Sequence, residues 1–233
     1  MHSNSYTIIF TSLVAIILGL FVSVANGTLK DIQDLNIEND SKKNILISLG
    51  FKEDPKNPWT AKSIQKLFNE NISSFILDEA GNKASGSKIK DANNASHSYL
   101  PIFSYQKNGV VNGYAIPISG KGLWSTLYGY FAIDPDGVTA KGITFYSHKE
   151  TPGLGGEVDK LWFQKNFIGK KFVDEKGSLI GIKVVKGKAD PENSYEVDGI
   201  SGATITSKGV ENFLLNDLKK YEPFFKKIRK KDI

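Results

Sequence analysis

Apolar residues recur along this chain with three spacings, and each spacing predicts a different element. Residues 6–25 form one long, predominantly apolar run. Apolar positions three or four residues apart predict helices over 41–51, 60–72 and 207–221. Segments rich in β-branched and aromatic residues predict strands over 74–78, 100–106, 110–119, 122–134, 138–148 and 179–186.

Turn residues between these segments predict how the strands connect. Asn108-Gly109 is typical of a two-residue hairpin, and residues 134–137, which read DPDG, are typical of a second turn. Residues 79–98 are rich in Gly, Ser, Asn and Lys and predict a surface loop. Together these features predict an α+β fold with a mostly antiparallel sheet and flanking helices.

The run over residues 6–25 is about 30 Å long as a helix, which matches the hydrocarbon core of a bilayer. No Lys, Arg, Asp or Glu occurs before Lys30. We expect one transmembrane helix. A cleaved signal peptide is the alternative, since Ser23-Val24-Ala25 offers small residues at a cleavage position. Lys30, Lys42 and Lys43 do not set the orientation of the helix.

Composition narrows the chemistry of the chain. The 233 residues include no cysteine, which excludes disulfides, thiolate zinc sites and cysteine-ligated iron–sulfur clusters, so any electron chemistry needs a non-thiol cofactor. The three histidines lack metal-ligand spacing, and no P-loop, GxSxG elbow or GxGxxG fingerprint occurs. We therefore predict no metal site and no catalytic residue.

The formal net charge of +5 includes a basic cluster at residues 226–231. We expect a solvated end there, with a patch for anionic lipid as the alternative. Because no aromatic-interleaved basic motif accompanies the cluster, nucleic acid is not an expected partner.

Three segments are candidates for a ligand site. DGISGATITSKG, residues 198–209, places small hydroxyl residues before a helix and predicts a phosphate site to which Ser207 and Lys208 contribute; plain N-capping is the alternative. HKETPGLGGEVD, residues 148–159, predicts a loop that a flat ligand can approach closely, with an ordinary surface loop as the alternative. GLWSTLYGY, residues 122–130, contributes Trp124.

These motifs, in this order, resemble the C subunit of the Na+-translocating NADH:quinone reductases, and less closely its sister, the G subunit of Rnf-type ferredoxin:NAD oxidoreductases. The resemblance implies that a flavin transferase attaches FMN to Thr204 through a phosphoester. It implies that the transferase recognises Asp198, Ser201, Gly202 and Ala203. It also implies cofactor contacts from Trp124 and from the loop residues Glu150, Thr151, Gly153, Leu154 and Gly155.

The resemblance further implies an electron-carrying subunit in the bacterial inner membrane, with its FMN domain on the periplasmic side and other reductase subunits as partners. We expect an anchor over 1–27, a connector and helical part over 28–98, an FMN-binding domain over 99–221 and a basic tail over 222–233. A membrane-anchored binding protein without flavin is the alternative from another functional class.

Overall fold

The computed structural model describes residues 3–84 and 100–231, and the chain divides into two units, Met1–Asp40 and Ser41–Ile233. Helix α1 (Asn4–Ser48) begins in the first unit and ends in the second. Its apolar part has a mean hydropathy of 2.7 over 18 residues, none of them buried, and is long enough to cross a membrane. The expected polar connector after residue 27 is helical as well.

The last turns of α1 confirm the helix predicted over 41–51. The N–H of Phe51 donates to the carbonyl of Leu46, and the N–H of Gly50 donates to that of Ile47. Gly50 has a φ of +93°, so these bonds form a Schellman motif that ends the helix. The next helix, α2 (Ala61–Asn71), begins after Thr60, whose hydroxyl accepts the N–H of Ser63.

Among the described residues, five strands form one sheet in the order β1-β2-β3-β4-β5, and every neighbouring pair is antiparallel. These strands are β1 (Ile72–Leu77), β2 (Leu100–Lys107), β3 (Val110–Lys121), β4 (Thr126–Ile133) and β5 (Ala140–Ser147). The predicted antiparallel α+β fold is confirmed. From residue 85 on, the loop expected over 79–98 lies outside the described residues.

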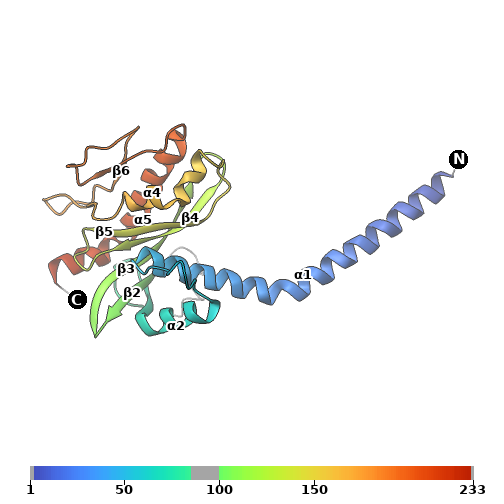
Figure 1. The fold of residues 1–233 in the computed structure, drawn as a ribbon, viewed down its shortest axis with the longest axis horizontal. Coiled ribbons are helices and arrows are strands. Elements are labelled where there is room, and N and C mark those ends of the chain that lie inside the picture. The colour runs from blue at the N-terminus through green and yellow to red at the C-terminus, as the bar shows by residue number, and fades with distance from the viewer. Residues whose placement is uncertain (1–2, 85–99, 232–233) are drawn as a thin grey trace. The chain divides into compact units, whose positions relative to one another are not determined.

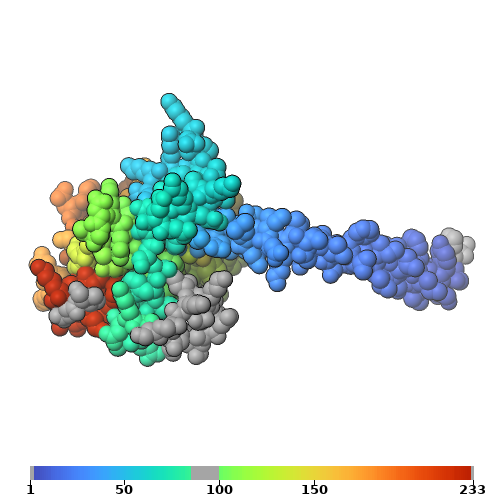
Figure 2. Space-filling model, turned by 90° about the horizontal axis from the view of Figure 1, so that it is seen from below, coloured from blue at the N-terminus to red at the C-terminus, as the bar shows by residue number. Residues whose placement is uncertain are grey.

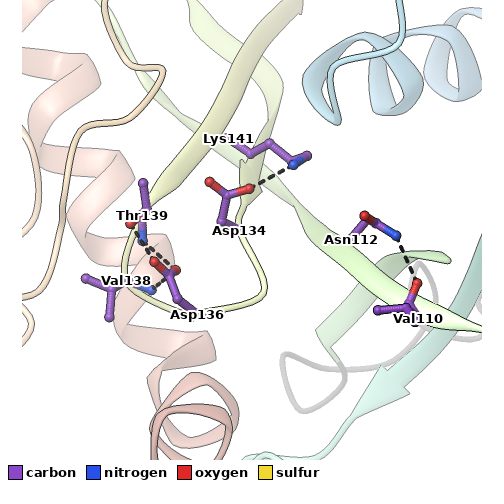
Figure 3. Close-up of polar contacts among 7 residues, drawn as sticks. All are labelled: Val110, Asn112, Asp134, Asp136, Val138, Thr139 and Lys141. Carbon is purple, nitrogen blue, oxygen red and sulfur yellow. Dashed lines mark hydrogen bonds and ion pairs between the residues drawn. The ribbon is translucent and has the colours of Figure 1, made fainter. Parts of the chain in front are cut away.

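Both predicted hairpins are present. Asn108 and Gly109 adopt φ values of 53° and 77°, which join β2 to β3 as a tight turn requires. In the β4–β5 turn, Oδ1 of Asp136 accepts the backbone N–H groups of Val138 and Thr139 at 2.8 and 2.9 Å (Figure 3). Lys141 pairs with Asp134 at 2.8 Å across the same turn. Local side-chain hydrogen bonds thus define this connection.

The sheet is buried on both faces, and residue parity separates them. In β4, Leu127, Phe131 and Ile133 join one core cluster, while Tyr130 and Ala132 join the other. The first cluster packs under α5 (Thr204–Lys230), and the second packs under α2 and the end of α1 (Figure 1). In Figure 2 the teal α2 segment lies next to the green segment that contains β2. Alternation along each strand therefore builds two cores.

Between β5 and α5 the chain forms short elements: η1 (Gly155–Asp159), α4 (Leu161–Lys165), β6 (Lys183–Val184) and β7 (Glu196–Val197). β6 and β7 form a separate parallel pair. The strand predicted over 179–186 is therefore too long, because only Lys183–Val184 forms a strand there. Gly181 has a φ of +80°, and the N–H groups of Ile180 and Gly181 both donate to the carbonyl of Phe172, so the backbone is not extended there.

Helix α5 is longer than predicted at both ends. It continues past Pro223 to Lys230, and Phe224 and Phe225 are buried in the first core cluster. An internal proline costs a helix about 3 kcal/mol, and burying each phenylalanine contributes about 2 kcal/mol. Arg229 also pairs with Glu222 and donates to the carbonyl of Gly137. Residues 222–230, expected as part of a basic tail, therefore continue the helix, and Phe224 and Phe225 belong to the core. Within the basic cluster, Lys226 and Lys230 are exposed.

Candidate functional site

The segment of residues 198–209 leads into α5. The helix begins at Thr204, and its N-cap residue Ala203, which is buried, makes no side-chain hydrogen bond to the first turn. The first N–H groups of a helix have no acceptor within the helix and carry the positive end of its dipole. This helix start can therefore bind an anion, as predicted from the sequence.

The four hydroxyl residues of this segment divide into two buried and two exposed residues. Thr206 is 1% exposed and donates to Oε2 of Glu150 at 2.8 Å. Ser207 is 4% exposed, and its hydroxyl oxygen accepts the N–H of Ile200 at 3.1 Å. Ser201 and Thr204 are exposed. Because Thr204 and Thr206 lie about 200° apart around the helix axis, burying one exposes the other.

Glu150 is 5% exposed and connects three segments of the chain. Its Oε1 accepts the N–H groups of Trp124 and Ser125 at 2.9 Å, and its Oε2 accepts the N–H of Leu123 at 3.2 Å and the hydroxyl of Thr206. Burial raises the pKa of this carboxyl, but these hydrogen bonds outweigh burial and hold the pKa below its ordinary value. Glu150 is therefore an ionised link between residues 123–125 and α5.

Two glycines make room for this carboxylate. A Cβ on Gly155 would lie 2.6 Å from Oγ1 of Thr206 and 2.7 Å from Oε2 of Glu150. A Cβ on Gly122 would lie 2.8 Å from Oε1 of Glu150. Gly153 differs, because it has a φ of +74° and open space where a Cβ would point. The sequence pattern suggested that these glycines serve a ligand, but the neighbours of Gly155 belong to the chain itself.

The loop of residues 148–159 is closed at its base and reaches the helix start at its tip. Nδ1 of His148 accepts the N–H of Glu150 at 3.3 Å, and its Nε2 lies 3.5 Å from Oδ2 of Asp159. The carbonyl of Thr151 accepts the N–H groups of Leu154 and Gly156. Leu154 is 43% exposed, and its Cδ2 would lie 2.8 Å from a Cβ on Gly202. The loop and the residue 202 turn are thus in contact.

The carboxylate of Asp198 is bound to neighbouring residues of the folded chain. The Lys188 ammonium, which donates to Oδ2, and the N–H of Ala189, 2.9 Å from Oδ1, keep the pKa of Asp198 below its ordinary value. The Asp198 side chain is 18% exposed. The segment before Thr204 is therefore tied to residues 188–189 and is not a free extended strand.

A cavity of about 700 Å³ lies against the start of α5. Six of the residues singled out from the sequence line it: Gly153, Ser201, Gly202, Thr204, Ser207 and Lys208. Lys208 is exposed and pairs with Glu211. The other candidates (Trp124, Glu150, Thr151, Leu154, Gly155, Asp198 and Ala203) lie outside the lining, although Leu154 borders it through Gly202.

Sequence reasoning missed several residues of the lining, above all Trp162. This side chain is 43% exposed, and its Nε1 donates to Oε2 of Glu157 at 2.8 Å. Residues 184–188 form another part of the wall. The tryptophan eight residues after Leu154 was the available signal, but only folding brings residues 184–188 to this position.

Trp124 is 71% exposed and presents its indole to solvent, while its backbone N–H is bound to Glu150. Leu154 is also a large exposed apolar residue, and it borders Gly202 just before α5. Glu150 connects the backbone of Trp124 to Thr206 in the first turn of α5. Exposed apolar side chains around an anion-binding helix start suit a ligand with both a phosphate and an aromatic ring.

Comparison with known proteins agrees with this chemistry. Residues 122–219 match the FMN-binding domain family, and this range includes GLWSTLYGY, the loop of residues 148–159 and the first turns of α5. FMN carries both a phosphate and a flat aromatic ring.

Curated relatives match almost the whole chain. The C subunit of the Na(+)-translocating NADH-quinone reductase of Vibrio anguillarum is 35% identical over 98% of this chain and 98% of its own length. The same subunit of Pseudomonas aeruginosa is 31% identical over 91% of this chain and 90% of its own. The chain belongs to this C subunit family. The resemblance drawn from the three motifs is confirmed.

Solved structures of the C subunit share the fold. The protein from Parabacteroides distasonis is 34% identical and superposes with a TM-score of 0.72, covering 84% of this chain and 96% of that one. NqrC of Shewanella oneidensis, at 23% identity, gives a TM-score of 0.71 over 81% of this chain and 96% of its own, which shows a common fold.

Proposed function

We propose that this protein is the electron-carrying C subunit of a membrane Na+-translocating NADH:quinone oxidoreductase and holds FMN covalently, through a phosphoester to Thr204. One observation carries this assignment. Thr204 presents an exposed hydroxyl in the first turn of α5, at a helix start without a side-chain cap, on the wall of the 700 Å³ cavity. The C subunit relatives and the FMN-binding domain match support the choice of cofactor.

Attachment is a group transfer that a separate flavin transferase carries out. Oγ1 of Thr204 displaces a nucleoside monophosphate from a flavin dinucleotide. One P–O–P bond breaks, one phosphoester forms, and the hydroxyl proton is released. The exposure of Ser201 and Gly202 beside Thr204 supports their recognition by the transferase. Recognition of Asp198 and Ala203 is proposed from the resemblance alone, because Ala203 is buried and Asp198 is paired with Lys188.

The charges around Thr204 suit the remaining negative charge of a phosphodiester. The first N–H groups of α5 lie at this position and have no acceptor within the helix and no side-chain cap. Lys186 lines the cavity and has no acidic partner among the described residues, so its ammonium is available to an anion. The hydroxyl oxygen of Ser207 already accepts the N–H of Ile200, which leaves its proton free to donate to an anion.

The ring of the cofactor is best accommodated between Trp124 and the loop from Thr151 to Gly155. Trp124 and Leu154 are exposed apolar side chains that would lose contact with water there. When bound, FMN supplies one-electron redox chemistry. The residues of the chain bind the ring, orient it and exclude water from one side of it. A covalent bond at Thr204 prevents loss of the cofactor.

Helix α1 is long and apolar enough to support a single-pass anchor, with the span at about residues 6–25. On the resemblance alone, we propose that the membrane is the bacterial inner membrane and that the FMN domain lies on its periplasmic side. The other reductase subunits are the proposed partners. Electrons derived from NADH would reach this protein from one of them and leave toward quinone, so the isolated chain should neither oxidise NADH nor reduce quinone.

The assignment is tested by co-expressing the chain with a flavin transferase and looking for flavin that survives denaturation. The wild-type protein should give a fluorescent flavin band on a denaturing gel and an intact mass raised by one FMN. Thr204→Val should abolish both, whereas Ser178→Ala, which removes an exposed hydroxyl outside the cavity lining, should keep both. A band that persists in Thr204→Val, with an intact mass still raised by one FMN, would contradict attachment at Thr204.

A further inference from the structure

Glu150 poses an electrostatic problem at the proposed site. It is a buried, ionised carboxylate one hydrogen bond away from the first turn of α5, where the phosphate of the cofactor would bind. Two negative groups in one region repel each other. The donors on Glu150 balance its charge, but they do not by themselves explain why a carboxylate is placed here.

The carboxylate is not available as a direct ligand. The backbone N–H groups of residues 123–125, the Ser125 hydroxyl and the Thr206 hydroxyl all donate to it, which uses its acceptor positions. An ionised carboxylate has no proton to donate to a ring nitrogen or carbonyl. Glu150 also lies outside the lining of the cavity.

The contacts of Glu150 instead determine how the helix start is rotated. Thr206 is the third residue of α5, and its bond to Glu150 fixes which side of the first turn faces the protein. That choice turns Thr204 outward. The same carboxylate holds the backbone of Trp124, so one group aligns the hydroxyl and the aromatic residue. Because Gly155 and Gly122 have no Cβ, the carboxylate of Glu150 has room to lie between these two segments.

We infer that Glu150 is a positioning residue for the flavin. By binding Thr206 and the backbone at Trp124 together, it presents the hydroxyl of Thr204 in place of that of Thr206 and places Trp124 beside it. This role rests on the proposed attachment of FMN to Thr204, and it assigns Glu150 a task other than contact with the cofactor.

The test compares two buried carboxylates on the full-length chain, purified in detergent without flavin. Glu150→Gln keeps the size of the side chain but turns one acceptor into a donor. Asp217→Asn is the matched control. Asp217 is 5% exposed and accepts the N–H of Ser119 at 2.8 Å, which ties α5 to β3 about 20 Å along the helix from Thr204.

Each protein is incubated with flavin transferase and flavin adenine dinucleotide. The initial rate, the modified residue by peptide mapping and the visible spectrum of the attached flavin are then measured. In Glu150→Gln the rate should fall about tenfold or more, because the hydroxyl is misplaced, and part of the flavin should map outside Thr204. Asp217→Asn should keep the site, the spectrum and a rate within about twofold of wild type.

Should Glu150→Gln not fold, Thr206→Val replaces it, because that variant keeps the carboxylate with its backbone donors and removes only the link to α5. Its rate should fall in the same way, while Thr206→Ser should keep the wild-type rate. A Glu150→Gln or Thr206→Val protein with the wild-type rate, site and spectrum would overturn the role of Glu150. A wild-type chain that acquires no flavin would contradict the proposed function itself.

Discussion

The hydroxyl of Thr206 donates to the carboxylate of Glu150 at 2.8 Å, although 56 residues separate the two in the sequence. This bond shows that the hydroxyl residues of the segment 198–209 do not all serve a ligand. Thr206 and Ser207 fasten the helix start to the rest of the domain, and Ser201 and Thr204 are left exposed. Thr206 and Thr204 therefore have different tasks, which leads to separate predictions for stability and for flavin attachment.

Thr206→Val should destabilise the folded chain by about 1–3 kcal/mol, because Glu150 then keeps its buried charge with one donor fewer. Thr206→Ser retains the donor and should cost less. Urea unfolding followed by circular dichroism measures both losses. Equal losses in the two variants would show that the hydroxyl contributes little to stability.

Gly155→Ala should destabilise the domain more than Gly153→Ala. The new Cβ at residue 155 would lie 2.6 Å from Oγ1 of Thr206, and such overpacking costs about 1–3 kcal/mol in addition to the strained bond to Glu150. At Gly153 the space is open and only the φ of +74° opposes a side chain, a cost of about 1 kcal/mol. Thermal unfolding of both variants gives the order, and the reverse order would contradict the contact.

The folded chain should lose stability at acidic pH, because protonation of Glu150 removes the hydrogen bonds that favour its charged form. Because the folded pKa of this carboxyl lies below its ordinary value of 4.5, the unfolded chain binds the proton more readily than the folded chain. The stabilisation is therefore complete above pH 4.5 and is lost as the pH falls through the lower folded pKa. Urea midpoints measured from neutral pH into this acidic range should decline less steeply in Glu150→Gln than in wild type.

Phe225→Ala provides the apolar comparison. Phe225 is 0% exposed in the core beneath α5, so its removal should cost about 3–5 kcal/mol at neutral and at acidic pH alike. Lys226→Ala, at the exposed neighbouring position, should change stability by less than about 0.5 kcal/mol. Urea unfolding at both pH values checks the pair. A small loss in Phe225→Ala would mean that this end of α5 does not contribute to the core.

Much of the fold could be predicted because its signals are local. The Asn108-Gly109 hairpin, the turn at Asp136 and the cap at Thr60 depend on residues within a few positions of one another. The strand over 179–186 failed for the same reason. Its apolar residues favour a strand, but backbone hydrogen bonds to the carbonyl of Phe172 and the positive φ of Gly181 decide the backbone conformation.

The C-terminal end of α5 was predicted too early, because a local helix-breaking residue and a long-range packing contact favour different ends of the helix. Pro223 favours an early end of the helix, yet Phe224 and Phe225 pack in the core, and Tyr114 on β3 contacts both rings. Burial outweighed propensity. Sequence spacing cannot weigh such a contact, because it depends on a strand more than 100 residues earlier in the chain.

The sequence by itself determined the apolar helix, the run of antiparallel strands and the segment that contains Thr204, since periodicity, turn residues and motif spacing are properties of neighbouring residues. Only the tertiary structure decided which hydroxyls of that segment are buried, that Glu150 binds Thr206, and that Trp162 and residues 184–188 line the cavity. Those outcomes depend on packing between distant segments, which local preferences do not specify.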